Sequence, residues 1–330
     1  MKGCEIKVIS VVVPCFNEEE VIEKFYWSFF EVSHQIDNEC FELIFIDDGS
    51  IDKSLKVIKK LCMITTNVRY LSFTRNFGKE AAIFAGLEFA QGEYIVVMDI
   101  DLQDPPQLMT KMYEIIIEGE YDCIATYRIN REGESPIRSF FAKQFYKIIN
   151  KIGDVQLVQG ARDYRMMTKK MVQSILSVRE YNRFSKGIFN WVGYRTKWLG
   201  YYNQERILGT TKWSFWGLFK YAIDGIVAFS TAPLVISCIM GIILFCIACV
   251  LVIVIIFKTI LFGDPVQGWP SLACLICFVS GVQLLSMGIL GQYLAKTYME
   301  IKRRPLYLIK EMGCSEDIED EINEENSYVR

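Results

Sequence analysis

Histidine is almost absent from this chain of 330 residues, since His34 is the only one. A single histidine excludes metal cages built from several imidazoles and argues against triad chemistry. The sequence also lacks G-x-G-x-x-G and Walker A motifs, which disfavours dinucleotide oxidoreductases and P-loop NTPases. There is no basic excess, because the formal net charge is -3, so no nucleic acid partner is expected. The eleven cysteines are odd in number and scattered, which is not the pattern of a disulfide framework.

The sequence contains two long apolar runs without charged residues near its C-terminus. Residues 225–257 contain no charged side chain, and a second uncharged run covers residues 265–295. Because about 20 apolar residues cross a bilayer as a helix, we predict transmembrane helices at 231–257 and 270–295, joined by a short extracytoplasmic loop at 258–269. A buried helical hairpin in a soluble core is the alternative. The C-x-x-C pairs inside these runs are interpreted as apolar helix residues rather than zinc ligands.

Basic residues flank both predicted spans, which sets their orientation. They are Lys212 and Lys220 before the first span, and Lys296, Lys302, Arg303, Arg304 and Lys310 after the second. By the positive-inside rule the domain before the first span and both termini are expected to face the cytoplasm, and no secretory signal is expected. Residues 211–230 are predicted to form an amphipathic helix at the membrane interface. Residues 296–330 are predicted to be a cytosolic basic flank followed by an acidic, disordered tail.

Residues 1–210 alternate strand and helix patterns and are predicted to form one cytosolic domain. The predicted strands are Ile6–Val13, Phe41–Ile46, Val68–Phe73 and Tyr94–Met98, with helix patterns between them. Such alternation indicates an α/β fold with a mostly parallel sheet and helices on both faces.

Polar clusters follow the end of each predicted strand. They are PCFNE from Pro14 to Glu18, Asp47 and Asp48, RNFGK from Arg75 to Lys79, and DID from Asp99 to Asp101. In an open α/β sheet, ligands bind at the carboxyl ends of the strands. Four such coincidences favour a ligand site at this edge more strongly than any single motif does.

The residue types in these clusters suit an anionic substrate and a hard cation. Asp99 and Asp101 can converge on one divalent ion, Mg²⁺ or Mn²⁺, and Gln103 can add a carbonyl oxygen. Asp47 or Asp48 suits a nucleobase N–H or a ribose hydroxyl. Lys79, together with Arg75, supplies positive charge for phosphates. An ion held in this way bridges a diphosphate and neutralises its charge as it leaves.

Four strings carry a resemblance to a known family: VPCFNE from Val13, IDDGS from Ile46, RNFGK from Arg75 and DIDLQDPP from Asp99. They resemble family 2 glycosyltransferases with a GT-A fold, and more closely the polyprenyl-phosphate glycosyltransferases. That group includes dolichyl-phosphate mannose synthase and bacterial undecaprenyl-phosphate sugar transferases with two C-terminal transmembrane helices. The resemblance covers roughly residues 6–310, and its most specific string is DIDLQDPP.

The resemblance assigns expected roles to individual residues. It places Pro14, Phe16, Glu18, Asp47, Asp48, Lys79 and Asp99 at the donor nucleotide, and Asp99, Asp101 and Gln103 at the metal. Asp163, in the GARDYR segment from Gly160, and Asp101 are the expected catalytic residues. Arg128, Arg138, Arg206 and Lys212 are the expected contacts of the acceptor phosphate or the diphosphate.

The expected reaction is an inverting, metal-dependent transfer of a sugar from a nucleotide sugar to a polyprenyl phosphate. UDP-glucose and undecaprenyl phosphate are the default substrates of the bacterial branch. One alternative is a processive polysaccharide synthase, although its Q-x-x-R-W motif is absent. Another is a non-catalytic membrane scaffold or partner subunit. Small residues in the second span, at Gly281, Ser286, Gly288 and Gly291, permit helix packing, so a homo-oligomer is left open.

Overall fold

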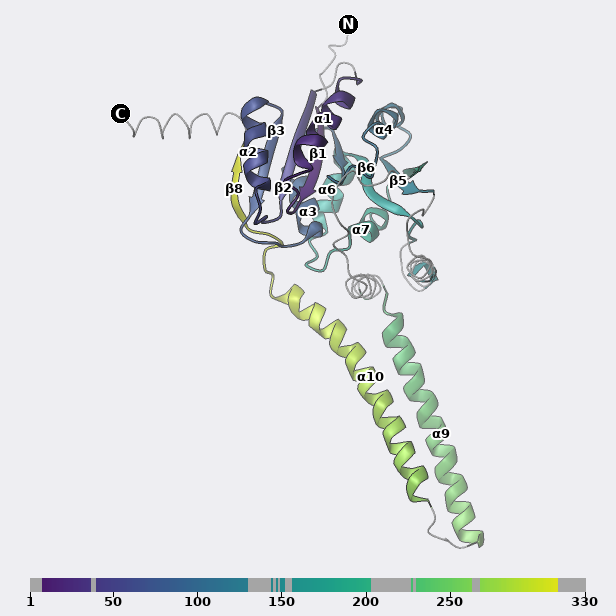
Figure 1. The fold of residues 1–330 in the computed structure, drawn as a ribbon. Helices are drawn as coiled ribbons and strands as arrows, with labels where there is room; N and C mark the ends of the chain where they lie inside the picture. Colours follow the sequence, from purple (N-terminus) through teal and green to yellow (C-terminus); the bar gives the residue numbers. More distant parts are fainter. Residues whose placement is uncertain are drawn as a thin grey trace, which may run out of the picture.

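The computed structural model describes residues 8–36, 40–129, 156–202, 230–262 and 268–313, with isolated positions at 144, 147, 149–151 and 227. These residues form an α/β domain from which two long helices extend side by side (Figure 1). The expected fold class is therefore confirmed.

Eight strands form one mixed sheet in the order β7-β5-β6-β4-β1-β2-β3-β8. Their bounds are β1 Val8–Cys15, β2 Cys40–Asp47, β3 Val68–Phe73, β4 Tyr94–Val97, β5 Cys123–Arg128, β6 Ala161–Thr168, β7 Thr196–Tyr201 and β8 Ile309–Gly313. The central strands β3, β2, β1 and β4 run parallel, and β5 is parallel to β7. Strand β6 is antiparallel to both of its neighbours, and β8 is antiparallel to β3.

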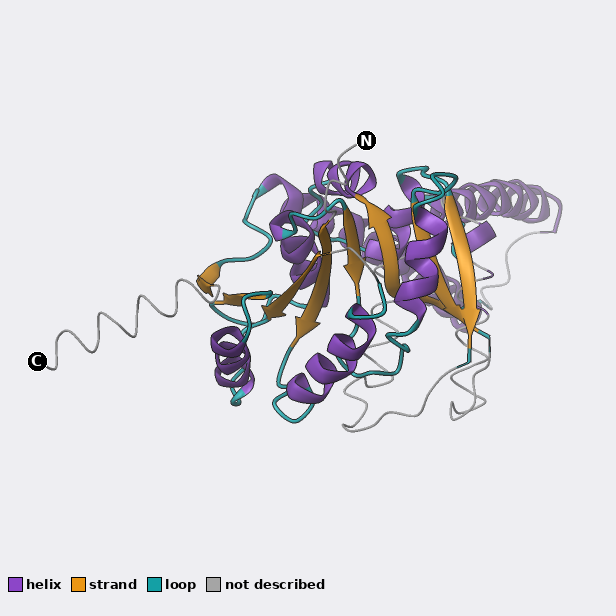
Figure 2. Cartoon of the chain, turned by 90° about the horizontal axis from the view of Figure 1, so that it is seen from above, coloured by secondary structure: helices purple, strands orange, loops and turns teal. Residues whose placement is uncertain are grey.

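Helices cover both faces of the sheet, as Figure 2 shows from above. On one face lie α1 (Ile22–Ser33), α2 (Ser54–Ile64) and α4 (Leu108–Ile116). On the other lie α3 (Lys79–Phe89), α6 (Lys169–Ser177) and α7 (Ser185–Trp191). The central strands are buried on both sides and therefore read as continuous apolar runs, which is typical of parallel sheets under two helical layers.

The two long helices are α9 (Ala232–Phe262) and α10 (Trp269–Ile301). Both are apolar enough to cross a membrane, over Ala232–Leu251 and Phe278–Ile301, and these segments are exposed rather than buried in protein. Exposed apolar length of this kind fits a lipid environment and not the core of a soluble hairpin. The Tyr293 hydroxyl donates to the carbonyl oxygen of Ser230 at 2.5 Å and so ties α10 to the chain two residues before α9 begins.

Three expected boundaries differ in the structure. Residues 258–262, expected in the loop, continue helix α9, and α10 extends past 295 to Ile301. Residues 309–313, expected in a flank and disordered tail, form β8 at the edge of the sheet. The domain is therefore not confined to residues 1–210. The interfacial helix predicted at 211–230 and the tail beyond Gly313 fall outside the described residues, apart from positions 227 and 230.

Candidate functional site

The site lies where β1 stands between β2 and β4. The connections from β1 lead to β2 on one side, while β4 returns to pair on the other side of β1, with all three strands parallel. In open α/β sheets, ligands bind outside the carboxyl ends of the strands at such a switch point. Pro14 is the second-to-last residue of β1 and pairs with Ile46 of β2. Phe16 and Glu18 follow β1 at this edge and are half-buried.

Asp47 ends strand β2 and is 1% exposed. Its Oδ2 atom accepts a hydrogen bond from the Ser72 hydroxyl at 2.7 Å, and its Oδ1 atom accepts from the Ser50 amide at 3.1 Å. Both carboxylate oxygens therefore hold neighbouring backbone and side chains in place. A contact of Asp47 with a nucleoside stays a prediction.

Asp48 fixes the loop before α3. Its carboxylate accepts the amides of Phe77 at 2.6 Å and Gly78 at 2.9 Å. Burial raises the pKa of Asp48, and these two amide bonds act against that shift. The next residue, Gly49, has a φ of +68°, and a Cβ atom there would lie 2.4 Å from the carbonyl carbon of Arg75. Only glycine fits this close approach of two loops.

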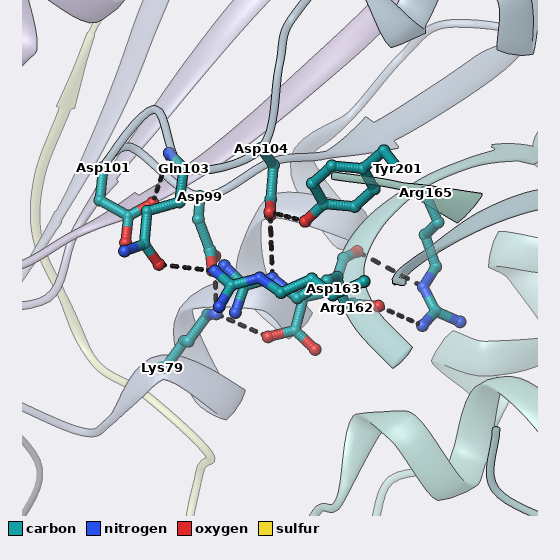
Figure 3. Close-up of polar contacts among 10 residues, drawn as sticks. Lys79, Asp99, Asp101, Gln103, Asp104, Arg162, Asp163, Arg165 and Tyr201 are labelled. Atoms are coloured by element: carbon teal, nitrogen blue, oxygen red, sulfur yellow. Dashed lines mark hydrogen bonds and ion pairs between the residues drawn. The ribbon is translucent and has the colours of Figure 1, made fainter. Parts of the chain in front are cut away.

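A charged cluster stands beside these loops (Figure 3). The Lys79 ammonium, at the first residue of α3, lies 2.6 Å from Asp99 Oδ1 and 2.6 Å from Asp163 Oδ2. One cation thus joins a carboxylate that follows β4 to one on β6, at sequence separations that no local pattern reveals. The Lys79 side chain is 40% exposed, so a ligand can reach it.

A second ion pair lies behind the first. The Arg162 Nε atom is 3.0 Å from Asp104 Oδ1, and the Arg162 guanidinium also approaches Asp99 Oδ2 at 3.7 Å. Asp104 is fully buried and accepts a further hydrogen bond from the Tyr201 hydroxyl. Our sequence interpretation assigned no role to these three residues. Asp104 lies in the DIDLQDPP string and Arg162 in GARDYR, so both strings carried a signal, whereas nothing local marked Tyr201.

The electrostatics of the cluster follow from its burial and its pairing. Burial disfavours the charged forms, but the Lys79 ammonium holds the pKa of Asp163 well below its usual range. In return, the carboxylates of Asp163 and Asp99 raise the pKa of Lys79. Burial raises the pKa of Asp101, and the nearby charge of Asp99 raises it further.

Asp101 and Gln103 lie next to this charge. The backbone amide of Gln103 donates to Asp101 Oδ1 at 3.2 Å, and the side-chain oxygen of Gln103 accepts from the Arg128 guanidinium at 2.7 Å. Among the described residues, no three His, Cys, Asp or Glu side chains group to hold a metal ion. Mg²⁺, however, is commonly held by one or two carboxylates together with substrate phosphates. Asp99 and Asp101 lie two positions apart just after β4, close enough for their charges to interact, and fit such a two-carboxylate site.

The structure thus brings together Lys79, Asp99, Asp101, Gln103, Arg128 and Asp163. It places Asp47 and Asp48 at the same edge, in supporting bonds. Arg138, Arg206 and Lys212 fall outside the described residues. The roles expected for all these side chains stay predictions.

Comparison with known proteins identifies the family. The family model described as glycosyl transferase family 2 matches residues 10–176. CsbB of Bacillus subtilis (strain 168) is 41% identical over 98% of this chain and 97% of that protein. The prophage bactoprenol glucosyl transferase homolog of Escherichia coli (strain K12) is 41% identical over 92% of this chain and 98% of its own length. The SfII prophage-derived bactoprenol glucosyl transferase of Shigella flexneri is 40% identical over 92% and 97%.

Among solved structures, glucosyl-3-phosphoglycerate synthase from Mycobacterium tuberculosis, crystallised with phosphoglyceric acid, aligns with a TM-score of 0.45 at 17% identity. The alignment covers 67% of this chain and 78% of that one. A likeness of that extent says nothing of the activity here. The activity class follows instead from the family model and the near-full-length relatives, which show that this chain is a glycosyltransferase that belongs to glycosyl transferase family 2.

Proposed function

We propose that this enzyme transfers glucose from UDP-glucose to undecaprenyl phosphate at the cytoplasmic face of the membrane, with inversion at the anomeric carbon and with a divalent metal ion. The observation that carries the proposal is where the charged cluster lies. Helix α10 joins the domain at the carboxyl edge of the sheet, since the amide of Thr74, just after β3, donates to the carbonyl oxygen of Leu308 at 3.0 Å. The carboxyl edge, which carries the charged cluster, therefore lies on the side of the domain from which the apolar helices extend (Figure 1).

The relatives support the same substrates. Two of them are named as bactoprenol glucosyl transferases, which favours a glucosyl donor and a polyprenyl lipid acceptor. A lipid acceptor explains why a glycosyltransferase domain would carry two exposed apolar helices, because the second substrate resides in the bilayer.

The chemistry expected of the site is a single displacement. A phosphate oxygen of the acceptor attacks the anomeric carbon, the bond from that carbon to the diphosphate breaks, and the nucleoside diphosphate leaves. A phosphate monoester is largely ionised at neutral pH, so the acceptor needs little activation by a base. Asp163 is ionised, because Lys79 lowers its pKa, and it can orient the acceptor or stabilise positive charge developing on the sugar.

The cationic side chains meet the other requirement of this reaction, which brings two anions together. Lys79, 40% exposed beside Asp99, and Arg128, bonded to Gln103, would bind phosphate oxygens and offset their repulsion. Asp99 and Asp101, with Gln103, would hold the metal ion. When bound, a divalent ion supplies positive charge that stabilises the leaving diphosphate.

The direct test incubates the full-length chain in bilayer nanodiscs with undecaprenyl phosphate and, separately, UDP-glucose, UDP-galactose, UDP-N-acetylglucosamine and GDP-mannose. We expect lipid-linked monosaccharide from UDP-glucose and loss of product after chelation of divalent ions. The anomeric configuration of the product reports inversion. Product from another donor alone, or undiminished transfer in the chelator, would contradict the corresponding part of the proposal.

The variant Asp101→Ala tests the metal assignment separately. We expect it to fold, insert into the membrane and lose transfer, because the ion loses one of its two carboxylates. Asp122→Ala, which alters a partly exposed carboxylate just before β5, is the control for general damage and should keep transfer. Full transfer by Asp101→Ala with added Mn²⁺ would refute the assignment.

A further inference from the structure

Strand β6 is irregular where it carries the site. Its pairing with β5 shifts between two points: Ala125 faces Arg165, whereas Tyr127 faces Ala161. Between these pairs β5 advances by two residues and β6 by four, so β6 holds two extra residues. The irregular segment is residues 162–164. We refer to it as the β6 bulge.

The β6 bulge explains how two adjacent residues reach one cluster. In a regular strand, neighbouring side chains point to opposite faces of the sheet. Here Arg162 approaches Asp99, while the next residue, Asp163, contacts Lys79, which itself contacts Asp99. A bulge can re-aim side chains in this way. It also interrupts the ladder, so the backbone carbonyls of the bulge need other donors.

Side chains supply those donors. The Arg165 guanidinium donates to the carbonyl oxygen of Arg162 at 2.9 Å and, through a longer contact of 3.4 Å, to that of Asp163. The Thr126 hydroxyl donates to the carbonyl oxygen of Tyr164 at 2.9 Å. All three carbonyls of the β6 bulge therefore accept from a side chain. Figure 3 shows the Arg165 guanidinium turned back toward the backbone of residues 162 and 163.

Arg165 is an unusual residue to find in this place. It is 1% exposed, and no described carboxylate forms an ion pair with it. Its guanidinium carbon lies 3.8 Å from the ring centroid of Phe189, on α7. The charges of Asp163 and Glu80 favour the protonated form of Arg165 without forming an ion pair with it. A buried charge that no carboxylate contacts is unfavourable, so its presence needs further compensating interactions. The planar fork of a guanidinium, stacked on an aromatic ring, can hold two carbonyls in a fixed direction, which an ammonium cannot do.

We propose that Arg165 is a positioning residue that fixes the β6 bulge and thereby turns Arg162 and Asp163 toward the same reaction centre. The proposal rests on the proposed function only in giving Asp163 a part in the reaction. It predicts that loosening the guanidinium impairs turnover more than nucleotide binding, because the nucleotide loops at Asp47 and Asp48 are held by other bonds.

The test compares Arg165→Lys with Thr126→Val in the full-length chain. Arg165→Lys keeps the charge and loses the fork. Thr126→Val removes the other support of the bulge and leaves the carbonyls of Arg162 and Asp163 bound. We expect Arg165→Lys to lower kcat about 100-fold, because a small misplacement of reacting groups has an effect of that size. Its affinity for UDP, measured by calorimetry, should stay within about twofold of the wild-type value. Thr126→Val should lower thermal stability while kcat stays within threefold.

A second variant covers poor folding of Arg165→Lys. Phe189→Leu leaves the guanidinium in place but removes its stacking partner, and we expect about a tenfold fall in kcat with unchanged UDP affinity. Wild-type kcat in the Lys variant, or in Phe189→Leu where the Lys variant does not accumulate, would overturn the proposal. So would an equal fall of kcat in Thr126→Val, since that would reflect general loosening of the sheet.

A readout without turnover separates this proposal from the proposed function. Amide hydrogen exchange, followed by mass spectrometry, should accelerate in peptides covering residues 160–166 of the Arg165 or Phe189 variant and not in peptides from β1 or β2. If the wild-type chain transfers no sugar to undecaprenyl phosphate but this exchange pattern is found, the proposed function fails and the positioning role stands. Unchanged exchange in the bulge would refute the positioning role whatever the substrates are.

Discussion

The buried pair of Asp104 and Arg162 gives the sharpest test of how the site is held together. Asp104 is fully buried and accepts from the Arg162 Nε atom at 3.0 Å and 3.2 Å through its two oxygens. It also accepts from the Tyr201 hydroxyl, which is itself buried. Replacing Asp104 by alanine would leave a largely buried guanidinium and a phenol without this partner. We therefore expect Asp104→Ala to be strongly destabilising.

The magnitude follows from burial. Removing one partner of a buried ion pair costs about 3–5 kcal/mol, because the remaining charge is left uncompensated. The 3.7 Å approach of Arg162 to Asp99 retains part of the interaction and favours the lower half of this range. For a domain of about 200 residues, 1 kcal/mol shifts Tm by roughly 2–4 °C, so a loss of about 3–4 kcal/mol should lower Tm by roughly 6–16 °C.

The chain offers a matched control in Asp122, which pairs with Arg195 at 3.7 Å. The two side chains are 25% and 67% exposed, so solvent screens the ion pair, and its loss should cost at most about 1 kcal/mol. The Asp122 carboxylate also accepts the Arg195 backbone amide at 3.2 Å, and the loss of that hydrogen bond should add about 1 kcal/mol. The assay is thermal unfolding of both variants in the same nanodiscs as the wild-type chain. Asp104→Asn, which keeps one acceptor oxygen, should lie between the two alanine variants.

The reasoning would be refuted if Asp104→Ala and Asp122→Ala changed Tm by equal amounts. Equal changes would mean that the buried pair contributes no more than an exposed one, and that Arg162 finds another partner when Asp104 is removed. Activity gives a second comparison, measured at a temperature where all variants are folded. There kcat should fall in Asp104→Ala, whose Arg162 is no longer held, and should be retained in Asp122→Ala.

Two further predictions concern neighbouring contacts. The pKa of Asp163 is depressed in the folded chain, so its pairing with Lys79 stabilises the fold fully above the unfolded-state pKa near 4 and is lost as the pH falls below it. The difference in urea midpoint between wild type and Lys79→Met should therefore be largest near pH 7 and shrink below about pH 4; a difference independent of pH would contradict the pairing. The Glu300 carboxylate accepts hydrogen bonds from the backbone amides of residues 181 and 182 at 2.8 Å and 3.2 Å. Glu300→Ala should therefore speed hydrogen exchange at these amides, while Glu300→Gln, which keeps the acceptor oxygen, should not. Equal exchange in both variants would argue against the contact.

Local patterns were enough to predict the half of the sheet that positions the site. The predicted strands at Phe41–Ile46, Val68–Phe73 and Tyr94–Met98 match β2, β3 and β4 within about one residue. These strands are buried on both faces and polar residues follow each of them within two positions, so hydrophobic runs and the polar residues after them mark the carboxyl ends of the strands. The clustering of carboxylates at the strand ends followed from the topology of parallel sheets alone.

The parts that sequence patterns missed depend on contacts between distant segments. Strand β8 is a short, partly exposed segment that pairs with β3, which lies about 240 residues earlier, and no periodicity in five residues reveals such a partner. The β6 bulge depends on a register shift against β5. The pairing of Asp104 with Arg162 depends on that bulge, because a regular strand would not bring Arg162 and Asp163 to one cluster.

After α10 the chain returns to the sheet, and this return limits how the domain can be oriented relative to the apolar helices. Only seven residues, 302–308, lie between Ile301, the end of α10, and Ile309, the start of β8, so the eight Cα-to-Cα steps span at most ~28 Å. On one side β8 pairs with β3, and on the other Glu300 binds the loop before α7. Two attachments on different parts of the carboxyl edge resist rotation of the domain about α10, which a single linker would allow. The distance and direction from the apolar helices to the reaction cluster are thus set by the fold itself, as an enzyme whose acceptor is confined to the plane of a membrane requires.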